Sequence, residues 1–292
     1  MGRVLRGLPG AGGLTVLALC AAAVLAAPAG AAGPTTCSGT VDSPGTVAGT
    51  IAGNLQVSGV CFVDAGPLVV NGNLTVQPGA ALIAAFGTTG SDVTVKGNVD
   101  VKNGGAAILG CNPESSPCFD DDPTNPTLTV TVAVAGNLTS SQALGVIVHN
   151  ATVGGNVEQH GGGGGFNCDP SGVFAAFGSP VFSTYEDSSV GGNLNISNVS
   201  SCWMGTARVD IGGNASYANN QLSDPDAIEI VSNHIHGNLS CQGNSMVWDS
   251  GDLTDDLFPR VPQPNTVDGM RSGQCVLASP MSPGGPLGPG PF

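Results

Sequence analysis

A short phrase recurs eight times in this chain: an aliphatic residue, any residue, Gly-Asn, and then a residue that is usually Leu or Val. All eight copies carry Ile or Val three positions before the asparagine, and only the copy with Ala215 is weak after it. The asparagines are Asn54, Asn73, Asn98, Asn137, Asn156, Asn193, Asn214 and Asn238. The successive differences between these sequence numbers are 19, 25, 39, 19, 37, 21 and 24. We interpret the two long gaps as doubled steps with one degenerate copy in each. The period of about 20 residues then predicts a solenoid of stacked units.

Each copy alternates between apolar and polar positions in the manner of a β-strand. The positions at −3, −1, +1 and +3 from the asparagine share one face of an extended chain, and those at −2, 0 and +2 share the other. The copy at 95–101 alternates cleanly and places Lys96 and Asp100 on the solvent side. Stacked in register, the eight asparagines should form an amide ladder whose side chains bond to one another.

These patterns predict an all-β fold, a single-domain parallel β-helix of about ten coils over residues 33–277. A coil of about 20 residues holds two or three short strands with their turns, and an aromatic content of 4% suits a narrow interior. The alternative is an antiparallel β-sandwich, in which the dipeptides would mark hairpin turns. The order Gly-Asn and the constant period favour the β-helix.

Both ends of the chain differ from the repeats. Residues 1–32 have a basic start at Arg3 and Arg6, an apolar run at 14–25 that is too short to span a bilayer, and small residues at 29–32. This is typical of a signal peptide, so we expect a secreted, extracellular protein with no membrane span. Residues 278–292 are rich in Pro and Gly and should form a disordered tail.

Once the expected signal peptide is removed, the chain is strongly acidic. It keeps all 21 acidic residues and five basic ones, so its net charge is 5 − 21 = −16. Such a surface repels phosphates and excludes nucleic acid as a partner. End-to-end assembly is open to a solenoid, but disulfides and irregular ends argue against it, so we expect a monomer.

Eight cysteines follow the expected signal peptide: Cys37, Cys61, Cys111, Cys118, Cys168, Cys202, Cys241 and Cys275. An even number in an exported chain indicates disulfides. Eight cysteines allow 105 connectivities, but in a solenoid each coil touches only its neighbours. We therefore expect nearest-neighbour pairs in the order given.

Two groups of side chains could hold a metal ion. Asp120, Asp121 and Asp122 stand in a loop after Cys111, where three carboxylates could collect oxygen ligands for Ca²⁺; the alternative is a solvated acidic loop, since no known calcium-loop spacing is present. His234 and His236 should project on one face of a strand, but the sequence shows no third ligand near them. No other cofactor is expected.

Several stretches resemble a known class of protein. They are Cys37-Ser38-Gly39-Thr40, the run at 76–80, Val-Gly-Gly-Asn at 153–156 and 190–193, the run at 237–244, and Gly273-Gln274-Cys275. The chain resembles secreted Val-x-Gly-Asn-Leu repeat proteins of unassigned role from high-GC Gram-positive bacteria and, more weakly, bactofilins. The resemblance implies a β-helix and export, and it transfers no catalytic residue.

The function expected from the sequence is structural or surface-interacting, with contact to a cell surface or a glycan. The alternative is a β-helix polysaccharide lyase or hydrolase, which needs a basic residue beside Ca²⁺-binding acids or a pair of carboxylates. Arg208 is the one basic candidate on a later coil with acids close in sequence, notably Asp210. Trp203 and Trp248 are either sugar-stacking platforms or caps of the core. No catalytic residue is assigned.

Overall fold

The computed structural model describes residues 33–87, 90–224, 228–247, 249 and 265–276. Within these ranges the chain is almost entirely β, and its only helix is the single turn α1 (Val173–Ala176). All strand pairings are parallel, apart from two isolated antiparallel bridges in a loop. The predicted parallel β-helix is confirmed, and the β-sandwich alternative is wrong. The signal peptide and tail predictions lie outside the described residues.

Three long sheets run along the stack. Sheet A consists of β1 (Thr35–Cys37), β4 (Leu55–Val57), β7 (Leu74–Val76), β10 (Val99–Val101), β13 (Leu138–Ser141), β16 (Val157–His160), β19 (Leu194–Ser197), β23 (Ala215–Ala218), β27 (Leu239–Gln242) and β29 (Arg271–Gly273). Sheet B consists of β2 (Gly45–Thr46), β5 (Val60–Phe62), β8 (Ala81–Ala84), β11 (Ala106–Leu109), β14 (Gly145–His149), β17 (Phe182–Glu186), β21 (Trp203–Ala207) and β25 (Ile228–Val231). Sheet C consists of β3 (Gly49–Ile51), β6 (Leu68–Val70), β9 (Val93–Val95), β12 (Val132–Val134), β15 (Ala151–Val153), β18 (Ser189–Val190), β22 (Asp210–Ile211), β26 (His234–Ile235) and β28 (Thr266–Val267). The short strands β20 (Ser200–Ser201) and β24 (Gln221–Leu222) pair separately.

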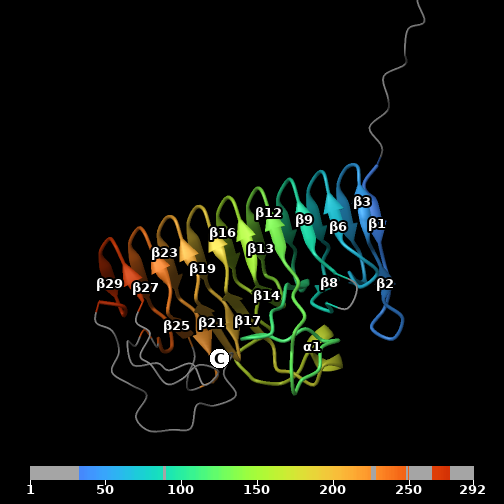
Figure 1. Cartoon of the computed structure of the whole chain (residues 1–292). Coiled ribbons are helices and arrows are strands. Elements are labelled where there is room, and N and C mark those ends of the chain that lie inside the picture. The colour runs from blue at the N-terminus through green and yellow to red at the C-terminus, as the bar shows by residue number, and fades with distance from the viewer. Residues whose placement is uncertain (1–32, 88–89, 225–227, 248, 250–264, 277–292) are drawn as a thin grey trace, which may run out of the picture. The chain divides into compact units, whose positions relative to one another are not determined.

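The chain winds through sheets A, B and C in turn and then repeats, so the coils stack in chain order from β1 to β29 (Figure 1). Sheet A has ten strands in the described part of the chain, which agrees with the expected ten coils. We predicted that the two coils without the asparagine lie inside the long gaps. They lie instead at the two ends of the stack.

The two long gaps are not doubled steps. β10 pairs directly with β13, and β16 pairs directly with β19, each in register. The extra residues form loops that leave the stack, at 110–131 between β11 and β12 and at 161–181 between β16 and β17. The prediction of two degenerate copies is therefore wrong: each gap is one coil with one insertion.

The Gly-Asn pair forms the corner between sheet C and sheet A. The strand of sheet C ends before the pair and the strand of sheet A begins directly after it, so the phrase is not one extended strand as predicted. The aliphatic residues on either side, such as Val70 and Leu74, point into the same core from two different sheets. The asparagines lie at the outer side of the corner, where they are half-buried or exposed.

The asparagines form a ladder, but most of its hydrogen bonds run from backbone N–H to side chain and not between side chains as predicted. In each coil the asparagine Oδ1 accepts a hydrogen bond of 2.8 Å from the backbone N–H of the next asparagine in the stack, and Asn238 accepts the same bond from Met270. Direct side-chain bonds join only Asn193 to Asn156 and Asn214 to Asn193 within the described ladder. The glycine is required because a Cβ on Gly72 would lie 2.2 Å from Asn54 Oδ1.

The structure contains four disulfides, and they are the nearest-neighbour pairs expected from the solenoid. They are Cys37–Cys61, Cys111–Cys118, Cys168–Cys202 and Cys241–Cys275. The first and last each join an end coil to its neighbour, and the second closes the base of the 110–131 loop.

Sheet B differs from the other two sheets because both of its faces are buried. Strands of sheets A and C alternate between buried and half-exposed residues, whereas β8, β11, β14, β21 and β25 are buried throughout. The inner face of sheet B contributes to the main core. Its outer face forms a second apolar cluster with residues of the two long loops, including Cys118, Val130 and Phe174. The loops therefore create an enclosed space on this face.

Candidate functional site

A cleft on the outer face of sheet B is the candidate functional site. It consists of two adjoining cavities of about 180 Å³ and about 450 Å³, which share Ser116, His149, Phe177, Ser179 and Phe182 among their lining residues. The floor is formed by sheet B, and the walls come from the loops at 110–131 and 161–181. A concave, mostly apolar space with a few polar groups is typical of a ligand site.

Aromatic rings form much of the wall of the cleft. Phe119 from one loop stacks on Phe177 from the other, with ring centroids 5.0 Å apart. On the sheet, Phe182 of β17 stacks on Trp203 of β21 with centroids 3.7 Å apart. Phe182 and Trp203 are cross-strand partners, so the parallel register itself places the two rings together.

The polar end of the cleft is formed by the last residues of two neighbouring strands. His149 ends β14 and Glu186 ends β17, and the two are paired in register, so both project on the outer face. His149 Nδ1 lies 3.8 Å from Glu186 Oε2, beyond hydrogen-bond distance. Glu186 accepts hydrogen bonds from the Thr184 hydroxyl at 2.7 Å and from Arg208 Nη2 at 2.8 Å.

A clamp behind the cleft connects the sheet to the 110–131 loop. Asp187 accepts hydrogen bonds from Arg208 Nε at 2.5 Å and Asn112 Nδ2 at 3.0 Å, and also from the Ser115 hydroxyl. Asp187 and Arg208 occupy the same corner in consecutive coils, and both have a positive φ, 49° and 56°. This backbone region is unfavourable for residues with a Cβ and often marks functional sites. Asp187 therefore connects Arg208 to the 110–131 loop.

Burial leaves the two titratable groups of the cleft uncharged near neutral pH. Burial raises the pKa of Glu186 to about 8, because the opposing hydrogen bond from Thr184 and the charge of Arg208 do not compensate for the lost hydration. Burial also lowers the pKa of His149 to about 4. For Asp187, burial acts to raise the pKa, but hydrogen bonds from Arg208 and Ser115 outweigh it and the pKa is lowered.

Two buried polar atoms of the cleft have no hydrogen-bond partner among the described residues. They are His149 Nδ1 and Trp203 Nε1. Both residues are almost fully buried, with exposed fractions of 5%. Buried polar atoms in proteins are almost always paired, so each unpaired atom needs an explanation. Both residues line the larger cavity of the cleft, which places these unpaired atoms next to the space where a ligand would bind.

The predicted Ca²⁺ ligands lie in the 110–131 loop, and two of them accept hydrogen bonds from other residues of the same loop. Asp121 Oδ2 accepts hydrogen bonds from the backbone of Thr127 and Leu128, and Asp122 Oδ1 accepts two from Thr124. Hydrogen bonds from the Thr124 side chain and backbone lower the pKa of Asp122. In the described part of the chain, no three potential ligand atoms within 4.8 Å of one another include Asp120, Asp121 or Asp122. The Ca²⁺ site stays a prediction.

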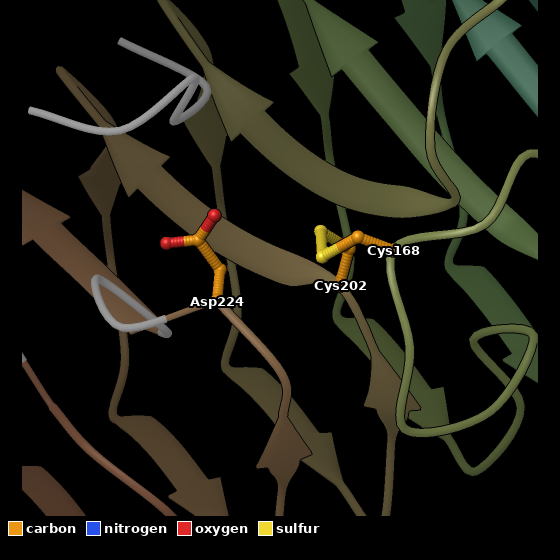
Figure 2. A group of neighbouring side chains, drawn as sticks. All are labelled: Cys168, Cys202 and Asp224. Atoms are coloured by element: carbon orange, nitrogen blue, oxygen red, sulfur yellow. A yellow bond between two sulfur atoms is a disulfide. The ribbon is translucent and has the colours of Figure 1, made fainter.

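Other residues singled out from the sequence fall into separate places. Arg208 pairs with Glu186 and Asp187 rather than with Asp210. Trp203 lines the cleft, and Trp248 lies outside the described residues. Asp224 sits near Cys168 and Cys202 (Figure 2), but the two sulfurs are bonded to each other, so this group offers no thiolate ligands.

His149 and Glu186 were not predicted from the sequence. A usable signal was present, because each is a titratable residue that ends a strand of otherwise uncharged residues, at 145–149 and 182–186. Their pairing could not be read from the sequence, since it depends on recognising residues 161–181 as an insertion within one coil.

Comparison of the chain with protein-family models, with curated proteins and with solved structures gave no match. In the described residues, no helix is both long and apolar enough to cross a membrane. The function therefore has to be argued from the cleft itself.

Proposed function

We propose that the protein is a secreted β-helix that binds a neutral sugar residue of an extracellular glycan in the cleft on sheet B, without cleaving it. The single observation that carries the proposal is the pair of buried atoms without partners, His149 Nδ1 and Trp203 Nε1. Both residues line the cleft together with Phe177 and Phe182, and Trp203 stacks on Phe182. Sugar rings present an apolar face and several hydroxyls, which suits such a site. The four disulfides are compatible with an oxidising, extracellular setting.

The charge of the cleft favours an uncharged ligand. Glu186 and His149 are both neutral near pH 7, and the charge of Arg208 is compensated by the ionised Asp187. An anionic glycan would find no free cation among the described lining residues and would meet an acidic protein. A lyase acting on acidic polysaccharides is thus the less suitable alternative.

The hydrolase alternative needs two carboxyl groups that face the same substrate. Glu186 is the only carboxylate among the described lining residues of the cleft. Asp187 lies beside it in sequence, but its oxygens are used by Arg208, Asn112 and Ser115. A binding role requires no second carboxylate, and for this reason we favour it.

The test is a binding titration with a panel of neutral and acidic oligosaccharides. A Trp248→Phe background leaves Trp203 as the only tryptophan, so its fluorescence reports on the cleft directly. We expect saturable binding of at least one neutral oligosaccharide. In calorimetry with otherwise native protein, Trp203→Phe keeps an aromatic ring but removes the pyrrole ring with its N–H, and should weaken binding at least about 10-fold, the effect expected for one hydrogen bond.

Phe166→Ala is the matched control, because Phe166 is 61% exposed and does not line the cleft. Its affinity should equal that of the native chain. If no neutral oligosaccharide binds, or if Trp203→Phe binds as tightly as Phe166→Ala, the proposal is wrong. Release of shorter products during the titration would replace the binding role by the hydrolase alternative.

A further inference from the structure

Two histidines and two aspartates form a cluster on the outer face of sheet C, on a different sheet from the cleft. It consists of Asp210 on β22, His234 on β26, His236 directly after β26, and Asp268 directly after β28. Asp210 and His234 are cross-strand partners. The residues between or beside them, Ile211 and Ile235, are fully buried in the core, so strand alternation directs the polar side chains outward.

We propose that Asp210, His234 and His236 bind one divalent transition-metal ion, with Asp268 orienting the two imidazoles. One ligand atom from each of the three residues lies within 4.8 Å of the other two. Asp210 Oδ2 is 3.5 Å from His234 Nδ1 and 3.5 Å from His236 Nε2. Ligands of a tetrahedral zinc ion at 2.0–2.2 Å are about 3.4 Å apart. The Asp210 contacts match this spacing with almost no movement.

The second aspartate completes the arrangement from the opposite side. Asp268 Oδ2 lies 3.1 Å from His236 Nδ1, a hydrogen bond, and 3.4 Å from His234 Nε2. Each histidine therefore turns one ring nitrogen to Asp210 and the other to Asp268. Metal-bound histidines usually donate their second ring N–H to a carboxylate, which fixes the ring and its tautomer. Asp268 stands in that position for both rings.

The donor set selects the class of ion. Two imidazoles and one carboxylate suit Zn²⁺, Cu²⁺ or Ni²⁺, whereas Ca²⁺ prefers six or more oxygen ligands. The side chains of His234, His236 and Asp210 are 41%, 42% and 58% exposed. An ion held by three surface residues keeps an open coordination position, which water or an external ligand can fill.

The experiment uses the full mature chain without a histidine tag, titrated with ZnCl₂ in a calorimeter and with CoCl₂ under visible absorption. We expect one Zn²⁺ per chain, and tetrahedral d–d bands with Co²⁺. His234→Ala and His236→Ala should each weaken Zn²⁺ binding at least 100-fold. Asp268→Asn, which alters only the orienting partner, should weaken it about 10-fold to 100-fold.

His160→Ala is the matched control. His160 is also exposed on an outer strand face, but it bonds to Ser197 and Asn198, which are uncharged. It should bind Zn²⁺ like the native chain. Thermal unfolding without metal establishes that each variant is folded. Absence of saturable 1:1 binding in the native chain, or unchanged binding in the folded His234→Ala and His236→Ala double variant, would overturn the proposal. A CaCl₂ titration should leave these histidines unaffected, and displacement of bound Co²⁺ by Ca²⁺ would also overturn it.

Discussion

The two residues of the repeated Gly-Asn pair have separate physical tasks. The asparagine supplies an oxygen that accepts the N–H of the next corner, at 2.8 Å in each step. The glycine leaves the space that this oxygen occupies, because a Cβ there would come within 2.2 Å of it in most corners of the ladder. The alignment of the asparagines in one row was predicted from the sequence. The need for glycine was not, because it depends on how close the asparagine of the preceding coil lies.

The two tasks predict different costs of substitution. Asn156→Ala removes the acceptor of the Asn193 N–H and should destabilise the protein by about 1 kcal/mol. Gly155→Ala places a Cβ 2.2 Å from Asn137 Oδ1 and should cost about 2–3 kcal/mol. Urea unfolding measures both free energies. Glu158→Ala, an exposed position on β16, serves as the control and should change little. A larger loss for Asn156→Ala than for Gly155→Ala would contradict this explanation of the pair.

The raised pKa of Glu186 predicts a loss of stability as the pH rises towards 8. Its pKa is about 8 in the folded chain and 4.5 ordinarily, so between these values only the folded state keeps the proton, and stability falls as the pH rises. His149, lowered from 6.5 to about 4, has the opposite effect below pH 6.5 and roughly cancels the fall there. Burial likewise raises the pKa of Asp249, but only to about 6, so its contribution is largely complete by pH 6.5.

Of the pKa shifts of Glu186, His149 and Asp249, only that of Glu186 acts between pH 6.5 and 8. The free energy of unfolding should fall there by at most about 1.4 kcal/mol per pH unit. Thermal unfolding at pH 6.5, 7.25 and 8 measures this slope in the native chain and in Glu186→Gln. The variant cannot titrate and should show a flat profile. An equal slope in both proteins would mean that another group is responsible.

At the scale of elements, the sequence predicted the strands well and the connections poorly. The two long gaps between asparagines are close to twice the shortest one, so length alone cannot separate a doubled coil from one coil with an insertion. The acidic run at Asp120, Asp121 and Asp122 indicated a loop after Cys111, and this is one of the two loops that wall the cleft. His234 and His236 were recognised as a pair, but Asp210 lies one full coil earlier and reaches them only through the register of β22 and β26.

The last coil depends on its disulfide more than an inner coil would. β29 pairs only with β27, and Cys241–Cys275 closes 34 residues between them. Replacing both cysteines by Ala removes about 3–4 kcal/mol in the chain-entropy description of such a crosslink. Because each coil contacts only its neighbours, the loss should be local. Hydrogen exchange should speed up in β27 and β29 and remain unchanged in β10 and β13. Uniform acceleration in all strands would show that the stack unfolds as one unit.

At the scale of the whole molecule, the aromatic residues are divided between the main core and the outer face of sheet B, where the cleft lies. The low aromatic content was taken from the sequence as a sign of a narrow interior, and the main core indeed consists of aliphatic residues with Tyr185 and Tyr217. Phe62, Phe86, Phe174 and Phe182 instead pack on the outer face of sheet B. The repeat thus predicts the inner core, while the cleft uses residues that do not repeat and could not be predicted from the period.

Because each coil contacts only its neighbours, we predict that one complete coil can be removed while the rest of the stack still folds. Deleting residues 73–97 takes out β7, β8 and β9 with no cysteine, and it joins Gly72 to Asn98 so that the corner phrase is restored. β10 can then pair with β4, because both share their register with β7. The deletion also removes the backbone partners of Phe119 and Asp120 on the 110–131 loop, so we expect a folded but less stable protein.

A shorter deletion should be more damaging than this longer one. Removing only residues 73–84 takes out β7 and β8 but leaves β9, so sheets A and B each lose a strand that sheet C keeps. The first coil after the deletion would then be out of phase with the coil before it, so the two parts of the stack would no longer pair at this junction. Far-UV circular dichroism and thermal unfolding compare the two deletions directly. The deletion of 73–97 should unfold cooperatively and the deletion of 73–84 should not; the reverse order would refute a stack held together by equivalent neighbouring coils.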